Sequence, residues 1–202
     1  MKRRILAGIL LALLTAPAQA KEKVTVELFV MSKCPFCVQV EKDLEAVVRA
    51  MGGSVVFSLD FVGTERDGQL TALHGEDEVK GNLIQICAKR HHPGDYMRLI
   101  HCMNENQRGI PEGWEQCANR VGVSIEAVQA CAEGEEGRNL LRDSYQRSKA
   151  KGALGTPTIL INGESYRGAR GEQAFIRVIC AAFSGKKPVR VDGFQFEIVF
   201  TR

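Results

Sequence analysis

Two β-rich apolar segments flank a stretch of helical periodicity near the start of the chain. Val24 to Val30 (VTVELFV) is mostly apolar, which is typical of a strand buried on both faces. From Pro35 to about Met51 apolar side chains recur at helical spacing, and Gly52-Gly53 follows. Val55 to Val62 (VVFSLDFV) predicts a second strand. The chain therefore opens β-α-β, the pattern of a parallel sheet.

The pattern changes after the second predicted strand. From about Gly75 to Ala153 the sequence predicts helical segments separated by turns, with no convincing strand. Ser124 is the expected N-cap of a long final helix that runs towards Lys151, and Gly134 can bend that helix.

Strand signals return near the C-terminus. Thr158 to Ile161 (TILI), an Asn162-Gly163 turn and Glu164 to Arg167 (ESYR) predict a β-hairpin. A helix is expected from Gly171 to Phe183, and the tail FQFEIVF at 194–200 is strand-like. This order of elements predicts an α/β protein with the thioredoxin fold and an all-helical insertion at about 75–153.

The first 20 residues have a different character. Three basic residues, a short apolar run from Ile5 to Leu14 and the end Ala18-Gln19-Ala20 are typical of a secretory signal peptide. The alternative is an uncleaved anchor, but the run is shorter than the about 20 residues of a membrane span. We expect cleavage after Ala20, which leaves 21–202 as a single thioredoxin-like domain of a periplasmic or secreted protein.

Export changes how the charge is interpreted. The signal segment holds three of the 27 basic residues, so the mature chain has 24 basic and 24 acidic residues. Nucleic-acid binding needs an excess of positive charge, which this balance does not supply. We expect no nucleic-acid partner.

Export also changes the expected role of the cysteines, because disulfides are the default outside the cytosol. A structural zinc site needs four ligands, typically in two close pairs, and only one close pair occurs here. No metal is therefore expected. The seven cysteines are Cys34, Cys37, Cys87, Cys102, Cys117, Cys131 and Cys180.

The close pair, Cys34 and Cys37, stands at the expected start of the first helix. There the unpaired N–H groups and the helix dipole stabilise a thiolate, and Lys33 adds a cation. Pro35 suits the first helical turn, while Phe36 offers no hydrogen bond to the thiolate. We expect Cys34 to be the exposed attacking nucleophile and Cys37 the deeper resolving thiol. An inert structural disulfide is disfavoured, because so small a loop constrains little of the unfolded chain.

Two further positions relate to this dithiol. Thr156-Pro157 directly precedes a strand, where thioredoxin-fold enzymes hold a cis-proline loop against the dithiol and leave the backbone open to a substrate strand. A trans proline opening an edge strand is the alternative, and the companion CxxC favours the cis form. Glu27, in the first strand, either relays the proton that Cys37 loses or faces solvent.

The chain resembles the DsbA-like branch of the thioredoxin superfamily. More narrowly, it is similar to the gamma-interferon-inducible lysosomal thiol reductase family and its bacterial relatives. The segments that carry this resemblance are FVMSKCPFC, HGEDE at 74–78, the four middle cysteines, CAEGEEG, TPTILING and Cys180. One departure is that Ala72 and Val79 stand where the lysosomal enzymes have cysteines.

Five cysteines remain outside the dithiol, so one is left over. Cys117 and Cys131 flank the turn at 121–123, and Cys87 and Cys102 flank the break at 91–95. We favour disulfides Cys117–Cys131 and Cys87–Cys102, although four cysteines allow three connectivities. Cys180 is expected to be a buried thiol.

The sequence thus predicts an exported thiol–disulfide oxidoreductase that most simply forms disulfides in extracytoplasmic polypeptides. The Cys34–Cys37 disulfide is its redox group, so no further cofactor is expected, and a membrane redox partner would recharge it. A disulfide reductase or isomerase using the same residues is one alternative. The others are a non-enzymatic binding module or chaperone with a structural Cys34–Cys37 bridge, and a metal or iron–sulfur carrier.

Overall fold

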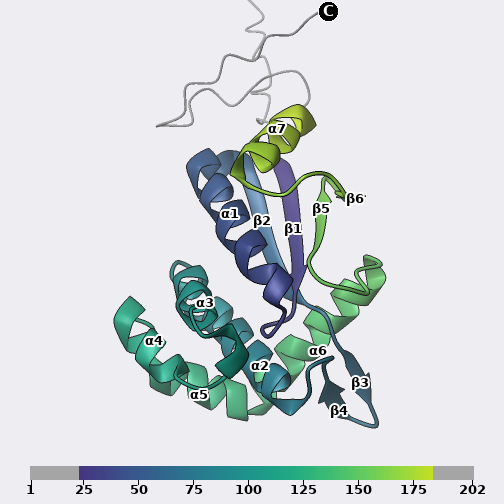
Figure 1. Ribbon diagram of the computed structural model, residues 1–202. Coiled ribbons are helices and arrows are strands. Elements are labelled where there is room, and N and C mark those ends of the chain that lie inside the picture. Colours follow the sequence, from purple (N-terminus) through teal and green to yellow (C-terminus); the bar gives the residue numbers. More distant parts are fainter. Residues whose placement is uncertain (1–22, 184–202) are drawn as a thin grey trace, which may run out of the picture.

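A four-stranded mixed sheet forms the centre of the fold (Figure 1). Its order is β2-β1-β5-β6, with β1 and β2 parallel and the other pairs antiparallel. The structure is a computed structural model that describes residues 23–183, so the predicted signal peptide and the strand-like tail lie outside it. The strands are β1 (Val24–Val30), β2 (Val55–Phe61), β5 (Thr158–Ile161) and β6 (Glu164–Ser165).

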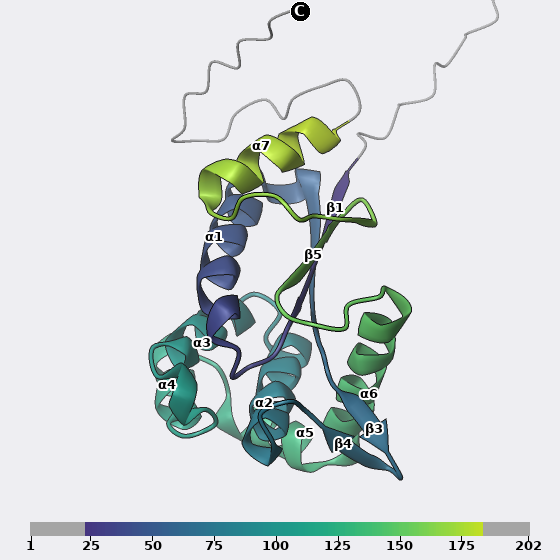
Figure 2. The same cartoon turned by 45° about the vertical axis from the view of Figure 1, so that its right-hand side comes forward.

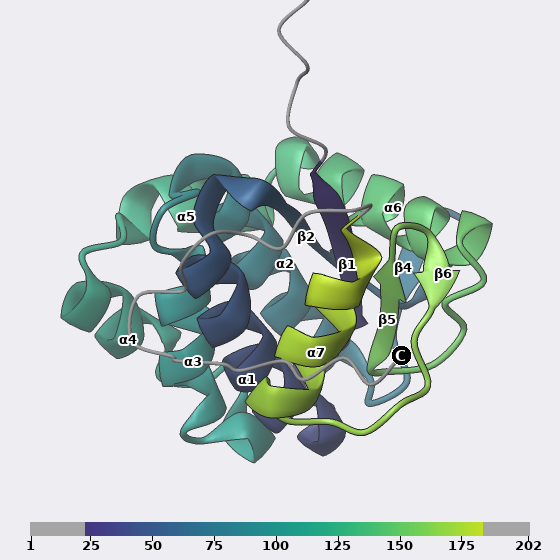
Figure 3. The ribbon, with the colours of Figure 1, turned by 90° about the horizontal axis from the view of Figure 1, so that it is seen from above.

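Helices cover both faces of this sheet. The helices α1 (Pro35–Met51) and α7 (Glu172–Ala182) pack together on one face, and α6 (Glu135–Ala150) lies against the other (Figures 2 and 3). The prediction that β1 is buried on both faces is wrong in part. Thr25 is exposed and Glu27 half-buried, because α6 ends beside Glu27 and leaves that part of the face uncovered.

The segment predicted to be helical contains five helices, with α6 as the last (Figure 1). The Ser124 hydroxyl accepts a hydrogen bond from the Ala127 N–H (3.2 Å), as expected of an N-cap. The expected single long helix is two, because Gly134 is extended and separates α5 from α6. The other four helices are α2 (Glu76–His91), α3 (Tyr96–Asn104), α4 (Trp114–Val121) and α5 (Ile125–Glu133). Within the described residues, no helix combines the length and apolar character needed to cross a bilayer.

A short hairpin precedes these helices and was not predicted. Its strands are β3 (Thr64–Arg66) and β4 (Gln69–Thr71), joined by Asp67-Gly68 with both residues at positive φ. An Asp-Gly pair is a strong hairpin signal. Alternating hydrophobicity could not reveal these strands, because they are short and largely exposed.

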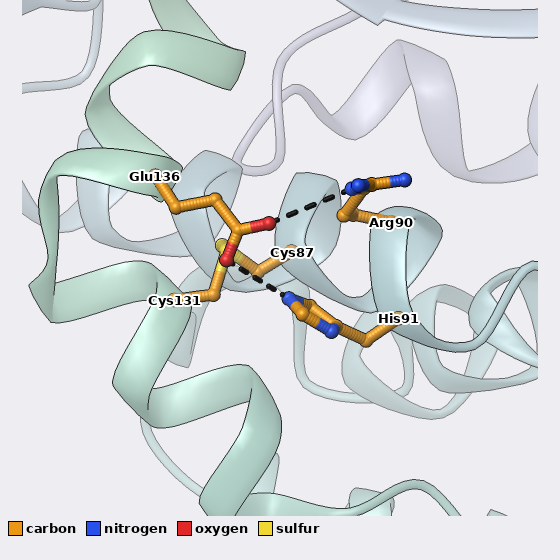
Figure 4. Close-up of a disulfide and its surroundings, with 5 residues drawn as sticks. All are labelled: Cys87, Arg90, His91, Cys131 and Glu136. Carbon is orange, nitrogen blue, oxygen red and sulfur yellow. Dashed lines mark hydrogen bonds and ion pairs between the residues drawn. A yellow bond between two sulfur atoms is a disulfide. The ribbon is translucent and has the colours of Figure 1, made fainter.

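All four middle cysteines form disulfides, but the predicted connectivity is wrong. The bonds are Cys87–Cys131 and Cys102–Cys117, with Cα–Cα distances of 5.8 and 5.6 Å. The partners come from helices that pack side by side, α2 with α5 and α3 with α4, rather than from helices joined by one turn. Figure 4 shows the first bond beside Glu136, whose carboxylate pairs with Arg90 and His91.

Candidate active site

The two cysteines of the CPFC sequence lie together at the N-terminus of α1, where the sequence places them. Cys34 is the N-cap residue and Pro35 the first helical residue. Both cysteines are thiols, and the Cys37 thiol donates a hydrogen bond to the Cys34 sulfur. The two sulfur atoms are therefore within hydrogen-bonding distance of each other.

The loop at Thr156-Pro157 lies against this dithiol. The Thr156–Pro157 peptide bond is cis, and the Thr156 carbonyl oxygen is 3.8 Å from Cys34 Sγ. The prediction that Cys34 is exposed needs correction, because only 5% of Cys34 is accessible, against 1% of Cys37. Cys34 is more accessible than Cys37, as predicted, but the Thr156 loop approaches the Cys34 sulfur and limits access to it.

The surroundings move the pKa values of the two thiols in opposite directions. The hydrogen bond from the Cys37 thiol has the largest effect on the pKa of Cys34 and lowers it. Burial raises this pKa, but further hydrogen bonds from Thr156 and from the backbone N–H groups of Phe36 and Cys37 lower it, and the resulting pKa of Cys34 is about 5. The hydrogen bond to Cys34, burial and the charge of Glu41 together raise the pKa of Cys37. Cys34 therefore carries the negative charge of the reduced pair, and Cys37 keeps its proton.

A buried carboxyl group beside the dithiol was missed by the sequence analysis. Glu41 follows Cys37 by one helical turn and is 2% exposed. Burial, with a smaller contribution from the charge of Cys34, raises the pKa of Glu41 to about 7, although Asn104 donates a hydrogen bond to its carboxylate. A signal in the sequence could have revealed Glu41. It stands four residues after Cys37, on the helix face that also carries the apolar residues Val40 and Leu44.

Glu27 and Lys33, both expected to tune the dithiol, make other contacts. The Glu27 carboxylate pairs with Lys151 at 3.0 Å and keeps 20% of its side chain exposed, so the buried-relay interpretation of Glu27 is wrong. The strand places its side chain towards α6, and the carboxylate that acts on Cys37 is Glu41. The Lys33 ammonium donates to the carbonyl oxygens of Arg108 (2.8 Å) and Ile110 (2.7 Å).

The low pKa of Cys34 leads to a prediction about alkylation. At pH 6 a thiol of pKa about 5 is mostly thiolate, whereas an ordinary thiol is roughly 0.3% ionised. The lower basicity of the thiolate offsets part of this gain, so we expect Cys34 to react with iodoacetamide roughly tenfold faster than free cysteine. Mass spectrometry of the reduced protein, after brief labelling, should find the label on Cys34 and not on Cys37. Equal labelling of both thiols would contradict this.

One group of side chains within residues 23–183 comes close enough to share a metal ion, and it lies away from the dithiol. It consists of His91, Cys131 and Glu136 (Figure 4). The Cys131 sulfur is bonded to Cys87, and the Glu136 carboxylate pairs with both Arg90 and His91. While that disulfide is intact, Cys131 cannot supply the thiolate that a metal ion binds.

Two family models match overlapping parts of the chain. The model described as "Gamma interferon inducible lysosomal thiol reductase (GILT)" matches residues 25–121, and the "DSBA-like thioredoxin domain" matches residues 84–179. A curated gamma-interferon-inducible lysosomal thiol reductase from Carassius auratus is 26% identical over 182 residues, which cover 82% of this chain and 70% of the relative.

Solved structures share the fold. A disulfide bond oxidoreductase (DsbG) from Mycobacterium tuberculosis superposes with a TM-score of 0.63 at 17% identity, covering 86% of this chain and 84% of the other. BdbD from Bacillus subtilis superposes with a TM-score of 0.63 at 18% identity, and the match covers 80% of this chain and 88% of BdbD. The chain thus has the DsbA-like thioredoxin fold, it is similar to the gamma-interferon-inducible lysosomal thiol reductases, and these matches support thiol:disulfide oxidoreductase activity.

Proposed function

We propose that this oxidoreductase forms disulfides in exported polypeptides. The oxidised enzyme carries a Cys34–Cys37 bond, and a client thiolate attacks the Cys34 sulfur. A mixed disulfide forms, and Cys37 leaves as a thiolate that takes up a proton. A second client thiolate then attacks the client sulfur of the mixed disulfide, and Cys34 leaves as a thiolate. Two electrons pass from the client to the enzyme.

The observation that carries the proposed direction is the stabilised Cys34 thiolate. The lowered pKa of Cys34 means that the reduced enzyme is favoured at neutral pH. A dithiol whose reduced form is stabilised gives a more oxidising disulfide. Client thiols are then oxidised while the enzyme is reduced.

An apolar groove lined by residues that precede the dithiol and the Thr156 loop in the chain supports a polypeptide client. The groove has a volume of about 410 Å³ and is lined by Met31, Leu73 and Leu154 among others. Leu73 and Leu154 are 76% and 80% exposed, an unusual degree of exposure for large apolar side chains. Since Leu154 precedes Thr156 by two residues, a chain that pairs with the Thr156 backbone could place an apolar side chain in this groove.

The proposed place of action is outside the cytosol. The pattern of residues 1–20 supports export, and the two disulfides of the helical segment suit an oxidising compartment. A membrane protein that accepts electrons from the Cys34–Cys37 dithiol would return the enzyme to its oxidised form. Thr156 and Pro157 are proposed as the substrate-binding residues, and Cys34 and Cys37 as the catalytic pair.

The experiment that tests the direction is the measurement of the reduction potential in glutathione buffers. Thioredoxin has a potential of about −270 mV and an active-site thiol pKa of about 7. The pKa of Cys34 is about 5, so its thiolate is more stable at pH 7 than that of thioredoxin. This difference in stability corresponds to roughly 50 mV, and we therefore expect a reduction potential of about −220 mV.

The second candidate function is disulfide reduction with the same residues. The Carassius auratus relative is named as a thiol reductase, which favours this candidate. A reductase needs a dithiol that is a strong electron donor, so a potential at or below that of thioredoxin would overturn the oxidase proposal and support reduction.

A further inference from the structure

The loop that leads into the dithiol is held by one face of α2. The Ser32 N–H donates to Asn82 Oδ1 (2.9 Å), and the Lys33 N–H donates to Glu78 Oε1 (3.1 Å). The Ser32 hydroxyl donates to the Glu78 carbonyl oxygen (3.1 Å). The two residues directly before Cys34 are therefore bonded to two residues that lie one turn apart on a single helix.

The side chains that make these bonds are themselves fixed. Glu78 and Asn82 are fully buried. The Glu78 carboxylate also accepts the His74 N–H (3.0 Å) and lies 2.7 Å from His74 Nδ1, while Asn82 Nδ2 donates to the Tyr145 hydroxyl (3.3 Å). Buried polar groups with all these partners rigidify the structure around them, because losing any one bond leaves a group unsatisfied.

Gly81 shows how closely α2 approaches this loop. A Cβ atom at position 81 would overlap the side chains of Ser32 and Ile110. The absence of a side chain therefore allows the helix to reach the Ser32 backbone, and Glu78, Gly81 and Asn82 form one continuous contact surface at i, i+3 and i+4 spacing.

Lys33 is held from the other side by the segment that follows α3. Gln107 Nε2 donates to the Lys33 carbonyl oxygen, and the Lys33 ammonium is bound by the carbonyl oxygens of Arg108 and Ile110. Both backbone polar groups of Lys33 are thus occupied by residues of the helical segment. Cys34 follows directly, and its N–H donates to Met31 O (3.0 Å) within the same turn.

We propose that Glu78, Gly81 and Asn82 are positioning residues for the dithiol, which hold Ser32 and Lys33 so that the Cys34 sulfur stays at the N-terminus of α1. Glu78 is the last residue of the HGEDE sequence, which has no part in the mechanism above. The inference rests on the proposed role of Cys34 as the reactive thiol. The helical insertion then sets the geometry of the active site as well as covering it.

Three roles for Glu78 predict different effects on the pKa of Cys34. If Glu78 acts through its negative charge, both Glu78→Gln and Glu78→Ala should lower the pKa, because a nearby anion disfavours the thiolate. If it only stabilises the fold, neither variant should change the pKa. If it positions the loop, Glu78→Ala should raise the pKa, whereas Glu78→Gln keeps an acceptor for Lys33 and should stay close to wild type.

The experiment follows thiolate absorbance against pH in reduced protein, together with alkylation rates at pH 5. We expect Glu78→Ala to raise the pKa of Cys34 by about one unit, which lowers the thiolate fraction at pH 5 roughly fivefold. The higher basicity of the thiolate offsets part of this loss, so alkylation at pH 5 should slow roughly twofold. The matched control is Glu76→Gln, an exposed carboxylate in the first turn of the same helix, which should leave the pKa unchanged. An unchanged pKa in folded Glu78→Ala would overturn the proposal.

A second variant keeps the test decisive if Glu78→Ala does not fold. Gly81→Ala retains every hydrogen-bonding group and favours helix, but its methyl group must displace Ser32 or Ile110. It should shift the pKa of Cys34 in the same direction, and an unchanged pKa would count against positioning. In the wild-type protein, slow exchange of the Ser32 and Lys33 amide protons is expected, and exchange at the rate of an open loop would refute the contact itself.

These readouts separate the inference from the proposed function. If the wild-type Cys34 pKa proved ordinary, the proposed oxidase chemistry would fail, while the amide exchange of Ser32 and Lys33 would still report whether α2 holds the loop. If the wild-type pKa is low and none of the α2 variants moves it, the positioning role fails and the oxidase proposal stands.

Discussion

Replacing Cys34 with serine is expected to reduce turnover to the uncatalysed rate, whereas Cys37→Ser is expected to trap covalent adducts with client proteins. Cys34 carries the stabilised thiolate and lies against Thr156, so we expect it to be the sulfur that exchanges with the client. Cys37 is more deeply buried and keeps its proton. When the reduced enzyme attacks a client disulfide, as in insulin reduction, Cys37 is the thiol that releases the client from the mixed disulfide, so its loss leaves that adduct without an internal thiol to resolve it.

The two variants should be compared by insulin reduction and by refolding of a scrambled substrate, with adducts detected on non-reducing gels. Cys180→Ser is the matched control, because Cys180 lies in α7 and takes part in neither disulfide. It should retain full turnover and, combined with Cys37→Ser, should still give the adducts. Equal residual activity in Cys34→Ser and Cys37→Ser would rule out the assigned division of roles.

The parts of the fold that could be predicted are those with strong local periodicity. The first helix begins at Pro35 and ends at Met51 as expected, because its apolar stripe is continuous and Gly52 stops it. The disulfide partners could not be predicted, because the four cysteines lie in four successive helices and sequence spacing does not report which of these helices bring two cysteines together. The long helix expected before Lys151 was divided by the backbone conformation of Gly134, which hydrophobic periodicity does not encode.

The active site shows the same division between local and non-local signals. Cys34, Cys37 and Thr156 carry signals in short motifs, so their neighbourhood could be anticipated once the β-α-β order was assigned. Glu41 was missed because a carboxylate in a helix is usually on its solvated face. The contacts of Glu78 with Lys33 join residues 45 positions apart, and nothing in the sequence near either residue indicates them.

Glu41→Gln is expected to slow the resolution of mixed disulfides by roughly 100-fold near pH 7. In the mixed disulfide that forms when the reduced enzyme attacks a client disulfide, the reverse of the proposed oxidation, Cys34 is no longer an anion, and Cys37 must lose its proton to attack the Cys34 sulfur. Glu41, whose pKa is raised to about 7, is suited to accept that proton, and positioned acid–base groups contribute about 10²–10⁴-fold. Glutamine keeps the shape and an acceptor for the Asn104 amide but cannot take up the proton.

Stopped-flow measurement of adduct resolution against pH would test this role. The wild-type rate should fall as the pH drops below about 7, because Glu41 becomes protonated, and this titration should be absent in Glu41→Gln. The matched control is Glu45→Gln, one turn further along α1, where the carboxylate pairs with Arg49 and should not affect resolution. Identical pH profiles in wild type and Glu41→Gln would exclude Glu41 as the acceptor.

The same group should leave a mark on stability that is independent of catalysis. Because burial raises the folded-state pKa of Glu41 above the unfolded value, its favourable contribution is fully present below about pH 4.5 and is lost as the pH rises through about 7. The shift corresponds to a cost of about 3 kcal/mol for the ionised carboxylate. Urea unfolding of the reduced protein should therefore find Glu41→Gln more stable than wild type at pH 8 and similar to it at pH 4.5. If Glu41→Gln had the same stability as wild type at pH 8 as well as at pH 4.5, ionisation of Glu41 would cost the folded protein little. Glu41 would then not have a pKa near neutrality and could not be the proposed proton acceptor.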